Sequence, residues 1–254
     1  MRTADWTESV SVLDRVTAVF DAFGEHDEGL GVSELARRAN LPKSTVSRIA
    51  ADLVAQRFLD RDGDRLFLGV RLFELAQSVE QPRRLRHFAL PVMTELRDAT
   101  GQTVNLAVLD GADVVFVAIV HGEPTCTPLA RIGGRLPAHA TALGKAILAF
   151  APEDVVGRII QGRPDVHTRH SVSEPSAFLR ELVDIRRLGV ATEKEESVNG
   201  RACAASAILG QGGAPIAAIS ATGSVSNVVP DRIAPAVHAA AITLSRRIAA
   251  AGQH

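Results

Sequence analysis

The spacing of hydrophobic residues predicts three helices in the first part of the chain. Over residues 9–23 the hydrophobic residues recur every three or four positions, so they share one helix face. After a Gly-containing break over residues 24–31, Ser33 is a candidate N-cap for a short second helix. Pro42 ends that segment and suits the first turn of a third helix over residues 43–56. The predicted inner face of this third helix comprises Val46, Ile49, Ala50, Leu53 and Val54.

A change of period then predicts a β-hairpin. Two apolar runs, at 58–59 and 66–68, flank the pair Asp62-Gly63, which is a strong hairpin signal. Helical spacing returns over residues 69–79, and residues 81–84 are predicted to be a joint between domains. Helix, turn, helix and hairpin, in this order, predict an N-terminal winged helix-turn-helix.

The second half mixes helices with strands. Alternating or continuous apolar runs predict strands, and three- and four-residue spacing predicts helices. The overall fold class predicted is therefore α+β, with an α/β domain after the helical N-terminal domain. The predicted strands are 104–109, 114–120, 202–209 and 214–221, and the predicted helices are 85–99, 140–150, 175–188 and 231–251.

Composition limits the class of protein without identifying it. The chain has 254 residues, of which 46% are hydrophobic and 22% charged, as in ordinary globular proteins of one or two domains. No apolar run approaches the roughly 18 residues of a membrane span, and the first residues lack a signal sequence. Cys126 and Cys203 have no metal-binding spacing. We therefore predict a cytoplasmic protein with no membrane partner, metal or cofactor.

Charge supports nucleic-acid binding only through its local placement. The net charge is −1, which does not favour polyanion binding. From Arg37 to Arg65, however, the chain has seven basic residues and four acidic residues, so this stretch is modestly positive. The exposed face of the predicted third helix carries short hydroxyl side chains and cations that suit phosphates and base edges. The predicted DNA-binding residues are Lys43, Ser44, Thr45, Ser47 and Arg48, with Arg61 and Arg65 on the hairpin.

Two other interpretations of this face stay open. Polar residues opposite an apolar stripe are usually a solvated surface. A winged helix that contacts only proteins is a further alternative, but it predicts an apolar or acidic exposed face, which residues 43–48 lack.

Three long segments carry a resemblance to a known family. Residues 32–48 (VSELARRANLPKSTVSR) resemble the DNA-binding motif of the IclR family of bacterial regulators. Residues 100–110 (TGQTVNLAVLD) and 134–146 (GRLPAHATALGKA) resemble two segments of that family's sensor domain. The resemblance spans about residues 9–250, in order and with few gaps.

The resemblance implies that the C-terminal domain is GAF-like and binds a small organic effector. Matching positions one by one gives the implied effector-binding residues Ala142, Leu143, Gly144, Glu193, Cys203, Ser220 and Thr222. This chain departs from the family at one of these residues and at a position shortly before Cys203. Glu193 stands where a shorter acid is common, and Arg201 lies one position earlier than the family's arginine, which reverses its side of a strand. The turn at 142–144 and the hydroxyl pair suggest a small carboxylate or an aromatic acid.

Together these observations predict an effector-controlled transcription regulator, most simply a repressor. The predicted domains are residues 9–71 for DNA binding, 72–85 as a linker and 86–254 for effector binding. A homodimer or tetramer is expected on a pseudo-palindromic site in double-stranded DNA.

An enzyme is the chief alternative. Cys203, His139 and Glu193 could form a nucleophilic trio, but no nucleophile elbow, metalloprotease or phosphate-loop motif accompanies them. Without the resemblance, Cys203 is simply a small buried residue, and Ser220 and Thr222 satisfy backbone groups. We therefore predict that the protein is not an enzyme.

Overall fold

The protein consists of two compact units, divided between Glu80 and Gln81. The structure, a computed structural model, describes residues 11–24, 28–123, 130–162, 166–172 and 174–251. Cys126 and residues 9–10 lie outside the described residues. Among the described helices, none combines the length and the apolar character that crossing a membrane requires.

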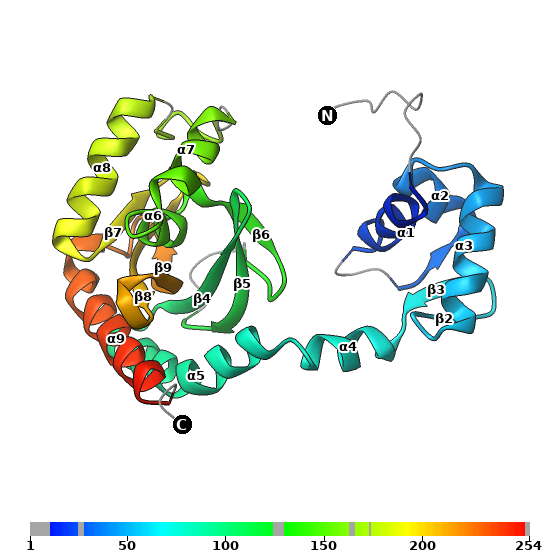
Figure 1. Cartoon of the computed structure of the whole chain (residues 1–254), viewed down its shortest axis with the longest axis horizontal. Helices are drawn as coiled ribbons and strands as arrows, with labels where there is room; N and C mark the ends of the chain where they lie inside the picture. Colours follow the sequence, from blue (N-terminus) through cyan, green and yellow to red (C-terminus); the bar gives the residue numbers. More distant parts are fainter. Residues whose placement is uncertain (1–10, 25–27, 124–129, 163–165, 173, 252–254) are drawn as a thin grey trace. The chain divides into compact units, whose positions relative to one another are not determined.

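The N-terminal unit is a winged helix-turn-helix, as the sequence predicts. Three helices enclose a small core of Val19, Leu35, Val46 and Leu53, and a three-stranded antiparallel sheet of order β1-β3-β2 packs beside it. Figure 1 shows the β2–β3 hairpin next to α3. The elements are α1 (Val12–Asp21), β1 (Leu30–Gly31), α2 (Val32–Ala39), α3 (Lys43–Ala55), β2 (Leu59–Asp62) and β3 (Arg65–Leu68).

One helix start differs from the prediction, and another agrees with it. The helix α2 begins at Val32 with Gly31 as its N-cap, so Ser33 is not the cap. Gly31 pairs with Arg65 in the sheet, and the helix starts two residues earlier than capping by Ser33 would place it. Pro42 is the N-cap of α3 and precedes its first turn. The backbone of Pro42 is extended (φ −57°, ψ 138°), and α3 begins at Lys43, as the sequence predicts.

The predicted joint at 81–84 is helical. These residues lie in the first turns of α5 (Glu80–Thr100), which follows the short helix α4 (Val70–Gln77). Pro82 is compatible with this position because backbone N–H groups in a helix's first turn have no partner within the helix. The helix that the sequence predicts from about residue 85 therefore begins earlier, at Glu80.

A six-stranded antiparallel sheet forms the centre of the C-terminal unit. Its strand order is β6-β5-β4-β9-β8-β7, so the last strands of the chain lie between the first ones and β7. The strands are β4 (Thr103–Asp110), β5 (Asp113–Val120), β6 (Arg135–Pro137), β7 (Ala191–Lys194), β8 (Arg201–Leu209) and β9 (Pro215–Ser224).

Helices cover both faces of this sheet (Figure 1). On one face α5 and α9 (Pro230–Ala251) pack against alternate strand residues such as Ala204 and Ile219. On the other face α6 (Ala142–Leu148), α7 (Glu153–Gln161) and α8 (Pro175–Leu188) pack against Cys203 and Ala218. Small residues on β8 and β9 let α6 approach closely. The α/β architecture predicted for this half is confirmed.

Candidate DNA-reading surface and effector cavity

The N-terminal turns of α3 present polar side chains to solvent. Opposite the buried residues Val46 and Ile49, the side chains of Lys43, Ser44, Ser47 and Arg48 are exposed, and Thr45 is half-buried. A helix with one buried face and polar residues at its start is the part of this motif that enters the major groove. The predicted reading residues therefore share one accessible face.

The corner between α2 and α3 fixes how that face is presented. Asn40 adopts the left-handed conformation (φ 52°) and its N–H donates to the carbonyls of Ala36 and Arg37. Leu41 is buried and anchors the corner in the core. Asparagine tolerates this conformation better than most residues, so the local sequence favours the turn.

The two wing arginines have different surroundings. Arg61 is exposed on β2. Arg65 uses Nη1 to donate to the carbonyl oxygens of Glu28, at 2.9 Å, and Gly29, at 3.2 Å. Arg65 thus braces the segment that precedes β1, a structural task that the sequence did not predict.

A small cavity lies between α6 and the sheet in the C-terminal unit. Its volume is about 30 Å³, close to that of one water molecule. Six of the seven implied effector residues line it: Ala142, Leu143, Glu193, Cys203, Ser220 and Thr222. Strand pairing brings them together, because Glu193 pairs with Cys203, and Cys203 with Thr222, across three adjacent strands.

Gly144 is the exception among these residues. It does not line the cavity, and its N–H donates to the side chain of the N-cap Thr141 at 3.1 Å. A Cβ atom at this position would lie 2.1 Å from the carbonyl oxygen of Ala138. Gly144 is therefore needed for close packing of α6, and its amide is already engaged.

The cavity also contains residues that sequence reasoning missed. Asn105 and Arg201 are the most polar of them, and Phe116, Leu136 and Ser197 add further wall. Arg201 was detectable, because it lies two residues before Cys203 and strand alternation places both on one face. Asn105 was detectable as the polar residue within an apolar strand, on the strand beside Ser220.

Glu193 and Cys203 lie opposite each other in the cavity wall, on the paired strands β7 and β8. Glu193 Oε1 accepts hydrogen bonds from the backbone N–H and the hydroxyl of Ser197, at 3.0 and 2.6 Å. Burial, together with the nearby Glu193 carboxylate, raises the pKa of the Cys203 thiol to about 12. Cys203 is therefore an uncharged thiol at neutral pH.

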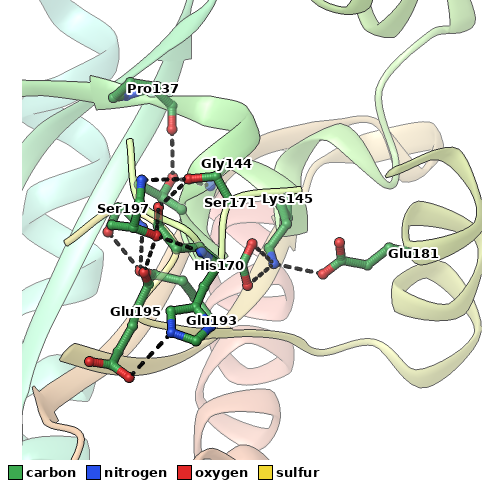
Figure 2. Close-up of polar contacts among 12 residues, drawn as sticks. Pro137, Gly144, Lys145, His170, Ser171, Glu181, Glu193, Glu195 and Ser197 are labelled. Atoms are coloured by element: carbon green, nitrogen blue, oxygen red, sulfur yellow. Dashed lines mark hydrogen bonds and ion pairs between the residues drawn. The ribbon is translucent and has the colours of Figure 1, made fainter. Parts of the chain in front are cut away.

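A buried lysine ties the loop after β7 to two helices (Figure 2). Lys145 of α6 is fully buried, and its Nζ lies 2.6 Å from Glu181 Oε1 and 2.8 Å from Glu196 Oε1. Burial alone would lower the pKa of Lys145, but the carboxylates of Glu196 and Glu181 outweigh that effect and raise it. The hydroxyl of Ser171 donates to the Glu196 carbonyl at 2.8 Å.

The same arrangement disfavours the charged form of the Glu196 carboxyl group. Burial, and then the carboxylates of Glu181 and Glu193, raise the pKa of Glu196 to about 6 against the opposing effect of Lys145. One ammonium group is thus shared between carboxylates. The loop after β7, which carries Ser197 to the cavity, is tied to α6 through the contact of Glu196 with Lys145.

The described residues contain no group of three or more His, Cys, Asp or Glu side chains arranged to hold a metal ion.

Two family models match the chain, one in each unit. Residues 12–63 match the family model described as the IclR helix-turn-helix domain, and residues 77–249 match the bacterial transcriptional regulator IclR C-terminal model. The transcriptional repressor IclR of Escherichia coli and the acetate operon repressor of Salmonella typhimurium are each 33% identical over 239 residues. These alignments cover 91% of this chain and 86% of each relative.

Solved structures show the same likeness. An IclR homologue from Microbacterium hydrocarbonoxydans, complexed with 4-hydroxybenzoate, is 30% identical with a TM-score of 0.85, and the match covers 94% of this chain and 100% of that one. The Thermotoga maritima IclR is 27% identical with a TM-score of 0.76, covering 93% and 98% of the two chains. From the matched models and relatives, the chain belongs to the IclR family of DNA-binding transcriptional regulators.

Proposed function

We propose that this protein is a repressor whose binding to a pseudo-palindromic operator is controlled by a small organic acid. The observation that carries the proposal is the exposed polar face at the start of α3, formed by Lys43, Ser44, Ser47 and Arg48. Arg48 and Lys43 can contact guanine edges or phosphates, and the hydroxyl groups can contact either. Relatives that are named repressors support the direction of control.

The proposed division of labour follows the predicted domains. Residues 9–71 bind DNA, residues 72–85 link, and residues 86–254 bind the effector. In this proposal Arg61 contacts the DNA backbone from the wing, whereas Arg65 mainly braces β1. Thr45 is half-buried and contributes at the edge of the reading face.

The effector proposal rests on the cavity below α6. Its apolar walls and its few polar groups are typical of small-molecule sites. A solved relative holds 4-hydroxybenzoate, which supports an aromatic or other small acid as the ligand class. Because the cavity of about 30 Å³ is smaller than such an acid, binding requires the walls to move. The effector would change the affinity for DNA if it bound two conformations of these walls with different affinities.

A homodimer or tetramer is part of the proposal. Two exposed hydrophobic groups support it: Val12 and Leu13 of α1, and Val70, Phe73 and Leu75 of α4, which has no buried residue of its own. Contiguous exposed apolar surface on a monomer commonly marks a protein interface. A dimer would place two copies of α3 on two half-sites. We place the protein in the cytoplasm, with the chromosome.

Cys203 does not favour the enzyme alternative. A nucleophilic cysteine needs a lowered pKa, whereas burial raises the pKa of Cys203 to about 12. The ring of His139 lies beside that of His167, with the ring centres 5.7 Å apart and the planes tilted by 34°. We therefore propose a binding role for this cavity, without turnover.

A gel shift tests the proposal. Purified protein is mixed with its own upstream DNA and excess nonspecific competitor, and a specific shift is expected. Arg48→Ala should weaken operator binding by about 1–3 kcal/mol, the range for a good base contact. Arg158→Ala is the matched control, because its side chain is exposed in the C-terminal unit and forms an ion pair with the exposed Asp154. Absence of any shift, across a genomic fragment library as well, would reject the proposed function.

A further inference from the structure

One polar group in the cavity has an unmet hydrogen-bonding need. The side chain of Asn105 is only 3% exposed, and its Nδ2 donates to Ser220 Oγ at 3.4 Å. Its Oδ1 has no hydrogen-bond partner among the described residues. Buried polar groups are nearly always paired, and an unpaired acceptor is unfavourable. A ligand that donates a hydrogen bond to Asn105 would remove this cost.

A positive charge lies at another part of the same cavity. Arg201 begins β8 and lines the cavity on the face that carries Cys203. Its guanidinium lies near enough to Cys203 to lower the pKa of that thiol, although burial outweighs the effect. Guanidinium groups bind carboxylates in a two-point geometry, so Arg201 suits an acidic ligand group.

Strand register separates these two groups. Asn105 pairs with Ser220, which pairs with Ala205, and Ala205 lies four residues after Arg201 on β8. The backbones of Asn105 and Arg201 are thus about 13 Å apart along the strands and about 10 Å apart across them. An extended arginine side chain is long enough to cover part of that distance. Apolar walls from Phe116, Leu136 and Leu143 lie in the same cavity.

We propose that Asn105 and Arg201 select the effector, and that this effector is a hydroxy acid. Arg201 binds its carboxylate, Asn105 Oδ1 accepts from its hydroxyl, and the apolar walls contact the carbon skeleton between the two. The inference rests on the proposed ligand-controlled function and specifies its ligand class. Neither residue belongs to the set that resemblance to the family implies.

Isothermal titration of the full chain with three probes tests the proposal. The probes are 4-hydroxybenzoate, benzoate, which lacks the hydroxyl, and 4-hydroxybenzyl alcohol, which lacks the carboxylate. We expect 4-hydroxybenzoate to bind at least tenfold more tightly than either analogue, because each analogue leaves one polar partner unsatisfied.

Two variants assign the preference to its residues. Asn105→Leu, of similar size, should bring 4-hydroxybenzoate and benzoate to equal affinity. Arg201→Gln should weaken both acids at least tenfold and leave 4-hydroxybenzyl alcohol unchanged. Ser206→Ala is the control, since Ser206 lies on the opposite face of β8, where it donates to the Gly189 carbonyl. Thermal unfolding by circular dichroism confirms that each variant is folded.

Equal binding of benzoate and 4-hydroxybenzoate to the unaltered protein would overturn the proposal, and this result does not depend on any variant. Survival of the hydroxyl preference in Asn105→Leu would overturn it as well, as would failure of all three probes to bind. A specific gel shift in the absence of probe separates the outcomes. Shift without probe binding rejects the hydroxy-acid assignment alone, and absence of shift rejects the regulator.

Discussion

Polar groups on the DNA-reading face and polar groups around the effector cavity differ in their hydrogen-bond partners. On α3 the polar side chains are exposed and solvated, so the fold does not depend on their identity. In the C-terminal unit polar groups such as Glu193, Lys145 and Asn105 are buried among strands and helices. Each of these needs a partner. Substitutions on α3 should therefore change DNA binding without changing the free energy of unfolding, whereas substitutions around the cavity should change both ligand binding and stability.

Removing the buried cation should have the largest effect. Lys145→Met leaves Glu196 and Glu181 without their shared ammonium group, and breaking a buried ion pair in this way costs about 3–5 kcal/mol. Urea unfolding of the C-terminal unit measures the loss. The double variant Lys145→Met/Glu196→Gln should recover part of it, because one uncompensated charge is also removed. A loss below about 1 kcal/mol would show that the cluster does not hold the loop.

A pair of glycines tests whether packing of α6 limits the cavity. Gly144→Ala forces a Cβ atom against the Ala138 backbone, and overpacking of this kind costs about 1–3 kcal/mol. Gly157→Ala is the matched control in α7, where an added Cβ would meet nothing within 4 Å. That change should stabilise the protein by about 0.5–1 kcal/mol. Equal effects at both positions would contradict the close approach of α6.

The raised pKa of Glu196 predicts a pH dependence. Its pKa is about 6 in the folded protein and 4.5 ordinarily, so the folded state binds more protons between these values. The contribution of Glu196 to stability therefore grows as pH falls through this window and is lost above pH 6. From pH 7 to pH 5 the protein should gain about 1 kcal/mol relative to Glu196→Gln, measured by urea unfolding at both values. If the stability difference between the protein and Glu196→Gln is the same at pH 7 and pH 5, the pKa of Glu196 is not raised.

The reading face should show the smallest effect on stability. Arg48→Ala should change the free energy of unfolding by less than about 0.5 kcal/mol while it weakens operator binding. Chemical unfolding and the gel shift, made on one preparation, measure the two quantities. A large loss of stability would mean that Arg48 supports the fold, and the contrast between the two regions would fail.

The sequence by itself determined the elements with long, regular patterns. Local hydrophobic period and turn chemistry predict the helices near residues 12–21, 43–55 and 175–188 and the hairpin around Gly63. Tertiary contacts stabilise these elements and do not change their type. The reading face follows too, because a polar side chain opposite a buried stripe has only solvent to face. Six of the cavity residues came from the resemblance to the family, not from local pattern.

Tertiary structure decided what depends on partners distant in the chain. The edge strands β6 and β7 are three and four residues long, too short for a period to identify, and the helix α7 went unpredicted. Arg65 has a structural role because its side chain donates to the Glu28 carbonyl. Gly144 has one because the backbone of Ala138 packs against it. The placement of Asn105 beside Ser220, and of Lys145 between two carboxylates, depends on strand order and helix packing. These are long-range properties, so no window of the sequence contains them.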